Sequence, residues 1–343
     1  GGFKCESKES NKDSGGQKMA YLAIETLMRG ARLRGPAPKD MSKERHIAIA
    51  GATGAVGLEM LKCLEDRDYP VGKLTLLASA RSVGKRLPFR GEDLEVEELT
   101  HDAFDGVEVA LFSAGGSISE EFAPSAAAAG ATVIDNSSAF RMDPEVPLVV
   151  PEVNPEAARD RPKGIIANPN CTTIVTLMGL YPLHRAFGLK ALIASSYQAV
   201  SGSGTQGILE LEQQVRALAE GAPIQQEVYP KQIAFNVIPH VDRFLEGGYT
   251  KEELKMQNEG RKILGLPDLK VTCTCVRVPV YRSHSVSLTA QFEKPVTVEA
   301  AQAAFDGYPG IRLVDDPGAA LYPTPLDTTG KDDCLVGRLR LDQ

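Results

Sequence analysis

Cys171 has the surroundings in this sequence that most favour chemistry. It lies in the stretch Asn168–Ile174, N-P-N-C-T-T-I, and the apolar residues that follow predict a buried helix. Pro169 and Asn170 are turn and capping residues, which places Cys171 in the first turn of that helix. The positive end of a helix favours a thiolate, so we expect a lowered pKa and a nucleophilic sulfur. The alternative is a small buried residue without chemistry.

A second stretch, Gly51–Gly57, has glycines spaced as in a phosphate-binding turn. It follows an apolar strand predicted at His46–Ala50 and precedes a helix predicted at Leu58–Leu64. Glycines in such a turn let the backbone approach a pyrophosphate, and the helix start attracts its charge. The spacing is G-x-x-G-x-x-G and not the commoner G-x-G-x-x-G, so a tight turn without a ligand is the alternative.

The end of the next predicted strand, Leu74–Ala78, indicates which dinucleotide would bind. NAD sites usually place an acidic residue there to bind the ribose hydroxyls. This chain has Ser79, Arg81 and Ser82 instead, and hydroxyls with a guanidinium suit a 2′-phosphate. We therefore predict NADP, with a solvated polar loop as the alternative. After another strand, the glycines of Ser113–Ser117 let a backbone approach a ligand closely.

These stretches need a scaffold, and the apolar runs predict one. In the first half, strands and helices alternate, which predicts a doubly wound, Rossmann-like α/β domain. The polar loop Asn136–Arg141 follows one of these strands, where open parallel sheets bind ligands. The second half contains an alternating strand pattern at His284–Phe292 and a helix introduced by a capping box of Thr250 and Glu253. It predicts an α+β domain with a mixed or antiparallel sheet.

We divide the chain into three parts. Residues 1–41 are rich in Ser, Gly, Lys and Arg, and we expect a targeting leader or a disordered extension there. Residues 42–168 are the predicted NADP-binding domain, and residues 169–343 the predicted catalytic and dimerisation domain. The strands expected in these domains are His46–Ala50, Leu74–Ala78, Glu108–Phe112, Thr132–Asp135, Ala191–Ala199, Val271–Val280 and His284–Phe292.

Composition excludes several classes of function. Of the 343 residues, 43% are hydrophobic and 24% charged, as in an ordinary globular protein. A net charge of -7 without a long basic run argues against nucleic acid or an anionic membrane as partner. No stretch approaches the roughly 18 consecutive apolar residues of a membrane span. Because cysteines and histidines form no clusters, we expect free thiols, a reducing compartment and no metal. Cys273 and Cys275 share a predicted strand, and we expect their side chains on opposite faces.

Taken together, these stretches resemble aspartate-β-semialdehyde dehydrogenase. The resemblance covers nearly all of residues 42–340 and rests on two specific motifs, N-P-N-C-T-T at Asn168–Thr173 and R-V-P-V-x-x-S-H-S at Arg277–Ser285. The other matching stretches are Gly51–Gly57, Ser113–Ser117, Tyr197–Gly204, Glu252–Ile263, Tyr322–Leu326 and Val336–Arg340. The resemblance implies an NADP-dependent oxidoreductase of lysine, threonine, methionine and isoleucine biosynthesis, present as a homodimer or homotetramer.

The resemblance also implies a mechanism. Cys171 would attack the aldehyde carbon of aspartate semialdehyde, the thiohemiacetal would lose hydride to NADP⁺, and phosphate would displace the thioester as aspartyl phosphate. Biosynthesis would run in reverse. His284 would move the proton of the thiohemiacetal oxygen, and Gln198 would orient the reacting centre. The implied substrate ligands are Arg277 for the carboxylate, Glu252 for the amino group, and Arg141, Lys255 and Asn170 at the phosphate. The implied cofactor ligands are Gly51, Thr53, Gly54, Ala55, Val56, Gly57, Ser79, Arg81, Ser82, Ser113, Gly115, Gly116, Ser201 and Gly202.

The sequence departs from the family at its end. The family's chains continue after V-G-R-x-R into a segment with an asparagine near the cofactor and a final helix, whereas this sequence stops at Leu341–Gln343. We therefore expect a fragment or a protein without that helix, with weaker cofactor binding and a less stable first domain. The alternatives are N-acetyl-γ-glutamyl-phosphate reductase, against which Gln198 and the pair of Glu252 and Lys255 argue, and a non-catalytic NADP-binding paralogue. We expect a cytoplasmic location, or a plastid if residues 1–41 remain from a leader.

Overall fold

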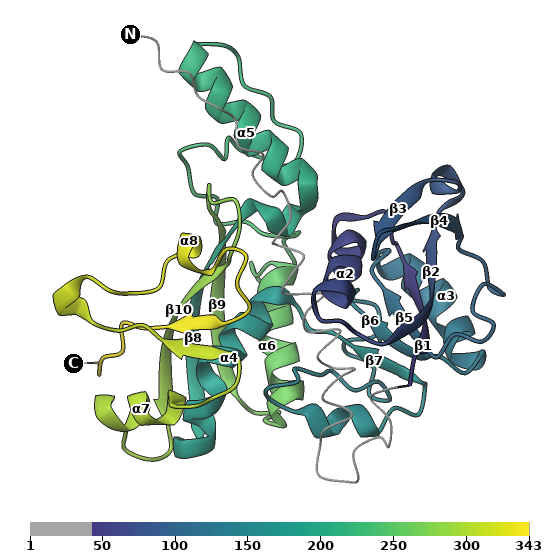
Figure 1. Ribbon diagram of the computed structural model, residues 1–343. Coiled ribbons are helices and arrows are strands. Elements are labelled where there is room, and N and C mark those ends of the chain that lie inside the picture. Colours follow the sequence, from purple (N-terminus) through teal and green to yellow (C-terminus); the bar gives the residue numbers. More distant parts are fainter. Residues whose placement is uncertain (1–42, 343) are drawn as a thin grey trace.

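Residues 43–342 are described in this computed structural model, and their longer strands form two sheets (Figure 1). The larger sheet has the order β3-β4-β2-β1-β5-β6-β7. Its neighbouring strands are parallel, except that β3 pairs antiparallel with β4 at one edge. The bounds are β1 Arg45–Ala50, β2 Val71–Ala78, β3 Arg86–Phe89, β4 Glu92–Glu98, β5 Val109–Phe112, β6 Thr132–Asp135 and β7 Ile165–Ala167. Strand order reverses beside β1, so the carboxyl ends of β1 and β5 mark the crevice where such sheets bind ligands.

Helices cover both faces of this sheet. Successive residues of β1 point to opposite faces, and both faces bury apolar groups. On one face Ile49 belongs to the same cluster as Met60 of helix α2, Ala55–Asp66. On the other face Ala48 belongs to the cluster of Ala123 in α3, Gly116–Ala128. This burial on both sides is why the strand is apolar throughout its second half.

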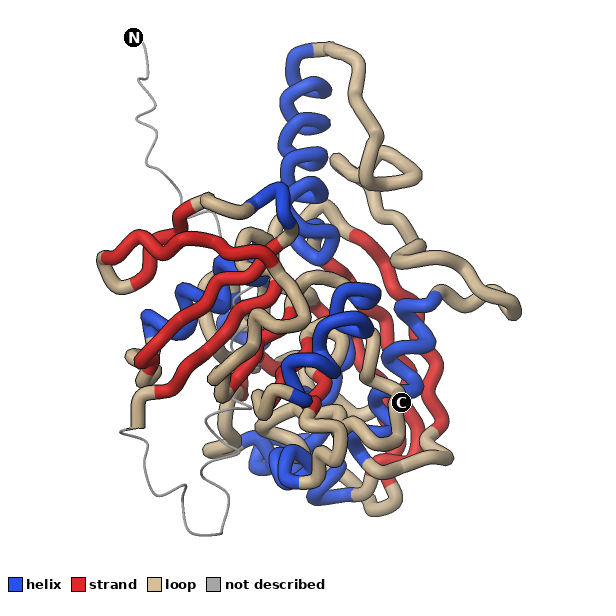
Figure 2. Tube along the Cα trace, turned by 90° about the vertical axis from the view of Figure 1, so that its right-hand side faces the viewer, coloured by secondary structure: helices blue, strands red, loops and turns tan. Residues whose placement is uncertain are grey.

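The smaller sheet has the order β10-β8-β9. Strands β8 (Leu189–Gln198) and β9 (Lys270–Arg277) are parallel, and β10 (Ser285–Phe292) is antiparallel to β8, so the sheet is mixed. Apolar side chains of α4 (Cys171–Phe187) and α6 (Lys251–Leu264) pack on one face of it. The long helix α5 (Gly204–Glu220) and the loop after it extend away from the rest of the chain (Figure 2). Shorter elements complete the fold: η1 Ala80–Ser82, η2 Pro155–Arg159, η3 Val200–Ser203, α7 Val298–Phe305, β11 Ile311–Leu313, η4 Pro317–Ala319, α8 Pro325–Thr328 and β12 Cys334–Val336.

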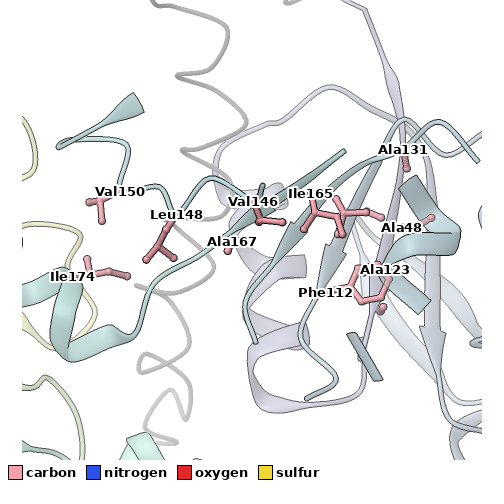
Figure 3. Close-up of a cluster of buried hydrophobic side chains, with 14 of the residues drawn as sticks. Ala48, Phe112, Ala123, Ala131, Val146, Leu148, Val150, Ile165, Ala167 and Ile174 are labelled. Atoms are coloured by element: carbon pink, nitrogen blue, oxygen red, sulfur yellow. The ribbon is translucent and has the colours of Figure 1, made fainter. Parts of the chain in front are cut away.

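One hydrophobic cluster joins the two parts of the molecule (Figure 3). It runs from Phe112 and Ile165 of the large sheet, through Leu148, to Ile174 of α4. Ile263 of α6 belongs to the same cluster. The helix that begins with Cys171 is therefore packed on the core of the large sheet.

The predicted fold class, a doubly wound α/β domain with a second α+β unit, is confirmed. The predicted boundary between residues 168 and 169 falls in the connection between β7 and α4, and residues 1–41 lie outside the described residues. One expectation was wrong: Cys273 and Cys275 are both buried, with exposed Thr272 and Thr274 on the other face. Residues two apart in a strand share a face, so the two thiols point the same way. Within residues 43–342, no helix is both long and apolar enough to cross a membrane.

Candidate active site

Cys171 is the first residue of α4, and Asn170 caps that helix. The side-chain oxygen of Asn170 accepts the backbone N–H groups of Thr172 at 2.9 Å and Thr173 at 3.4 Å. These are N–H groups that an α-helix leaves unpaired at its start. The N-P-N turn thus does what the sequence predicted, because it places the cysteine at the positive end of a long helix.

The pKa of Cys171 departs from the sequence-based expectation. Burial raises the pKa of this thiol to about 11, and the nearby Glu252 carboxylate adds to the rise. The positive charges of Arg141 and Arg277 act in the opposite direction. The expected lowering of the pKa was therefore wrong for the ligand-free chain, because the cost of a buried charge exceeds the help of the helix end. The sulfur is a thiol at neutral pH and needs a proton acceptor or a bound ligand to become nucleophilic.

Glu252, from the first turn of α6, connects several of the predicted residues. Its Oε1 accepts the side-chain N–H groups of Asn170 and Gln198, each at 3.0 Å. Its Oε2 lies 3.1 Å from Nζ of Lys255, one turn further along the helix. Burial raises the pKa of Glu252, but Lys255 and the two amide donors outweigh it, so the net pKa is lowered. The buried side chain is consequently an anion held by three donors.

Three further predicted residues lie where strands of the smaller sheet end. Gln198 and Arg277 are the last residues of β8 and β9 and face each other in register, while His284 directly precedes β10. Ala199 joins two of them. Nη1 of Arg277 donates to the Ala199 carbonyl at 2.7 Å, and the Ala199 N–H donates to Nδ1 of His284 at 3.0 Å. The side chains of an amide, a guanidinium and an imidazole therefore lie together at one end of the strands of this sheet.

The hydrogen bond to Ala199 decides the tautomer of His284. Nδ1 accepts the proton of the Ala199 N–H, so a neutral ring carries its own proton on Nε2. In this state the ring offers Nε2–H as a donor to an oxygen. The proton-accepting role implied by the resemblance requires the other tautomer, and the ring must give up the Ala199 bond to adopt it.

Both cations predicted at the phosphate are engaged with protein groups. Arg141 donates from Nε to the Asn168 carbonyl at 2.9 Å and from Nη2 to the Asn136 carbonyl at 3.1 Å. Its Nη1 lies 3.2 Å from Oε1 of Glu259 in α6. Lys255 lies 2.8 Å from Asp242 as well as near Glu252. Asn136, Asn168, Asp242 and Glu259 are contacts that the sequence analysis missed.

The predicted cofactor residues other than Ser201 and Gly202 lie at the carboxyl ends of β1, β2 and β5. Gly51 has φ +89°, and an added Cβ would lie 2.6 Å from the Ser113 carbonyl oxygen at the end of β5. At Gly57 an added Cβ would lie 2.2 Å from the Gly51 carbonyl oxygen, so helix α2 starts against the turn. Gly115, with φ +97°, has open space around it. Glycines at these positions form the type of backbone cradle that suits a pyrophosphate.

The remaining cofactor candidates fall into two groups. Ser79 and Arg81 are exposed just after β2, and Ser82 Oγ lies 3.5 Å from Oγ1 of Thr53 in the glycine turn. The loop after β2 thus contacts the loop after β1, as a ribose-phosphate site requires. Gly202 is different, because an added Cβ would lie 2.8 Å from Nη1 of Arg277. It lies beside the substrate candidates, and Ser201 precedes it in η3. Gly54 caps α2, Ala55 and Val56 are the first residues of that helix, and Gly116 is the first residue of α3.

Comparisons with known proteins agree with this arrangement. A family model described as "Semialdehyde dehydrogenase, NAD binding domain" matches residues 46–161, and one described as "Semialdehyde dehydrogenase, dimerisation domain" matches residues 180–343. The chain is 49% identical over 310 residues to the aspartate-semialdehyde dehydrogenase of Bacillus subtilis, covering 88% of this chain and 89% of that one. The chain belongs to the aspartate-semialdehyde dehydrogenase family. The identity to the Aquifex aeolicus member is also 49%, over 87% of this chain and 88% of that one.

Solved structures of this family have the same fold. The crystal structure of aspartate semialdehyde dehydrogenase II from Vibrio cholerae superimposes with a TM-score of 0.85 at 46% identity, covering 88% of this chain and 89% of that one. A second structure of the same Vibrio protein, complexed with ASA, matches equally well. The recognition made from the motifs, and the oxidoreductase class that it implied, are confirmed.

Proposed function

We propose that this chain catalyses the reversible, phosphate-dependent oxidation of L-aspartate 4-semialdehyde to L-aspartyl 4-phosphate with NADP⁺. The observation that carries the proposal is the position of Cys171 at the start of α4, with its capping residue bound to Glu252, which also binds Gln198. In a member of this family, these residues provide the nucleophile and the polar groups that a thioester mechanism needs. The physiological direction in lysine, threonine, methionine and isoleucine biosynthesis is the reverse.

The reaction proceeds in two halves, which are joined by a covalent thioester on the sulfur of Cys171. The His284 ring, in the tautomer that accepts at Nε2, takes the proton of the Cys171 thiol, and the thiolate adds to the aldehyde carbon as the C=O bond opens to an oxyanion. The C=O bond then re-forms as the C–H bond breaks and a hydride leaves, which gives the thioester. NADP⁺, when bound, supplies the hydride acceptor. Phosphate oxygen then attacks the thioester carbon, the C–S bond breaks, and Cys171 is released as aspartyl phosphate forms. Sulfur suits both halves because it is a good nucleophile and a good leaving group.

The surrounding residues support defined roles. Arg277 is buried, its planar guanidinium can grip the substrate carboxylate, and Ala199 fixes its position. Anionic Glu252 suits the substrate amino group, while Arg141 and Lys255 bring positive charge for phosphate. His284 offers Nε2–H to the oxygen of the thiohemiacetal. Gln198, held by Glu252, orients the reacting carbonyl.

The cofactor proposal rests on the end of β2. Exposed Ser79 and Arg81 stand where an NAD site has an acid, and buried Ser82 contacts Thr53 of the glycine turn. These groups suit a 2′-phosphate. A location in a reducing compartment such as the cytoplasm fits a mechanism that needs a free thiol, and the cysteines of residues 43–342 carry no disulfide.

We also propose that a second copy of the chain covers the outer face of the smaller sheet, the face turned away from α4 and α6. Ile193 and Tyr197 of β8 are 58% and 46% exposed there. The strand register sets four rows across this face: Gln291–Ala191–Lys270, Thr289–Ile193–Thr272, Ser287–Ser195–Thr274 and Ser285–Tyr197–Val276. Lys270, in the row at one end, carries the single charge among them, so the other three rows of two copies can pack face to face without charge repulsion. The face lies within the region matched by the dimerisation-domain model.

A spectrophotometric assay tests the activity. NADPH formation is followed with aspartate semialdehyde and phosphate, with N-acetylglutamate semialdehyde as the control substrate. We expect turnover that requires phosphate, prefers the aspartyl compound and vanishes in Cys171→Ser, whereas Cys334→Ser keeps it. Faster turnover of the N-acetylglutamyl compound, or activity in Cys171→Ser, would contradict the proposal.

A further inference from the structure

Helix α6 carries a polar stripe that reaches beyond the substrate residues. Glu252, Lys255, Glu259 and Lys262 are spaced by three, four and three residues, so they lie along one side of the helix. The first two belong to the proposed substrate site. The last two contact the segment 136–146, which follows β6 in the large sheet. The same helix therefore holds parts of the site that come from both halves of the chain.

Glu259 binds two pieces of the site at once. The residue is only 1% exposed. Its Oε1 lies 3.2 Å from Nη1 of Arg141, and its Oε2 accepts the backbone N–H of Asn170 at 2.7 Å. Asn170 directly precedes Cys171. One buried carboxylate thus fixes the distance between the proposed phosphate ligand and the start of the nucleophile's helix.

Lys262 binds the backbone of the segment that contains Arg141. Its Nζ donates to the carbonyl oxygens of Arg141 at 2.8 Å, Asp143 at 2.7 Å and Val146 at 2.8 Å. An ammonium group has three protons, so these contacts use all of them. A lysine in this arrangement acts as a brace for a loop, because it is committed to backbone oxygens and offers nothing to a ligand.

The geometry leaves Arg141 able to bind an oxyanion. Its Nε, one N–H of Nη1 and one N–H of Nη2 are occupied by Asn168, Glu259 and Asn136. The second N–H of each terminal nitrogen remains, since a guanidinium carries two protons on each. Each nitrogen of the guanidinium is consequently fixed by one protein group, from the loops after β6 and β7 and from α6, in the way that a rigid anion site requires.

We propose that Glu259 and Lys262 are positioning residues for the phosphate step: they hold Arg141 where phosphate attacks the thioester. This inference rests on the function proposed above. Phosphate enters only after the hydride has left, so a fault in this clamp should slow the second half of the reaction and spare the first. A residue that merely stabilises the fold would affect both halves together.

Glu259→Gln isolates the contact to Arg141. The glutamine carbonyl can still accept the Asn170 N–H, whereas its amide cannot replace the charge that pairs with Arg141. Without phosphate, rapid mixing with semialdehyde and NADP⁺ should give a burst of NADPH with wild-type amplitude. With phosphate, the KM for phosphate should rise about tenfold or more, while the KM for semialdehyde changes less than about twofold. Asn258→Ala, on the exposed side of the same helix, is the control and should change neither.

Lys262→Met is the second variant, and it keeps the inference testable if Glu259→Gln fails to fold. It removes the brace and leaves Glu259 intact, so it should also raise the KM for phosphate and spare the burst. Loss of burst and turnover in equal proportion, or an unchanged KM for phosphate in a folded variant, would overturn the inference. A wild-type chain that shows neither burst nor phosphate-dependent turnover would instead refute the proposed function.

Discussion

Two physical effects compete at Cys171. The start of α4 stabilises a thiolate, since the helix end is positive and Arg141 and Arg277 add charge. Burial and the Glu252 carboxylate oppose it, and in the ligand-free chain they prevail. A protonated thiol has an advantage for the enzyme even though Cys171 is only partly buried, because a neutral sulfur reacts slowly with oxidants and stray electrophiles until the site is occupied.

This balance predicts how alkylation of the free enzyme depends on pH. A thiol with a pKa of about 11 is almost entirely protonated at neutral pH. The rate of iodoacetamide modification should therefore rise about tenfold for each pH unit through the neutral range, without a plateau below about pH 10. The measurement is the amount of label incorporated in timed samples, with Cys171→Ser labelled in parallel as the background from the other cysteines. A plateau near neutrality would show that the thiolate already dominates in the free enzyme.

Arg277 offers a second test at the scale of one residue. Lysine keeps the charge but cannot reproduce a planar grip on a carboxylate while also donating to Ala199. We expect Arg277→Lys to lose about 2 kcal/mol of transition-state stabilisation, measured as kcat/KM for the semialdehyde. Arg312→Lys, at the exposed position of strand β11, is the control. A change smaller than about threefold in kcat/KM would remove Arg277 from the carboxylate site.

At the scale of elements, continuous apolar runs made the central parallel strands predictable. A strand such as β1 is buried on both faces, and no other short element needs such a run. The hairpin of β3 and β4 was not predicted because β4, Glu92–Glu98, is rich in exposed acidic residues and has no continuous apolar run, and β3 is a short edge strand. The glycine turn and the capped cysteine helix were predictable for a related reason, since each is encoded by neighbours in sequence.

Contacts between distant segments set the limit of sequence reasoning. Glu259 lies 89 residues after Asn170 and 118 after Arg141. No local sequence pattern predicts its hydrogen bonds to these two residues. Its distance of seven residues from Glu252 was the available signal, because two helical turns return to the same side. The raised pKa of Cys171 was missed for the same reason: it depends on how much of the chain surrounds the thiol.

The next prediction concerns the loop after β2, which we expect to determine the preference for NADP over NAD. Replacing exposed Ser79 with Asp adds a charge that repels a 2′-phosphate and gives the ribose hydroxyls an acceptor. The ratio of kcat/KM for NADP⁺ to that for NAD⁺ should fall about tenfold or more. Ser79→Ala, which removes the hydroxyl without adding charge, should lower it much less. Equal use of both cofactors by the unchanged chain would contradict the NADP assignment itself.

At the scale of the whole molecule, the two halves share one core, and the site lies where they meet. The cluster around Leu148 links the large sheet to α4 (Figure 3). Helix α6 reaches from the smaller sheet to the loop of Arg141. The outer face of the smaller sheet is directly connected to this site. Tyr197 on that face is followed by Gln198 of the site, so whatever covers the face also restrains the ends of the catalytic strands.

The last prediction concerns that face. Ile193 lies at the centre of its row, between Thr289 and Thr272, so in a face-to-face dimer it meets the same region of the other copy. Ile193→Asp would bring two carboxylates together in a desolvated interface, which is strongly unfavourable. We expect light scattering to show a shift from dimer or tetramer to smaller species, with a lower melting temperature. Leu326→Asp, at an exposed apolar residue of α8, is the matched control. If Ile193→Asp keeps the mass of the unchanged protein while Leu326→Asp dissociates it, the copies meet through another surface.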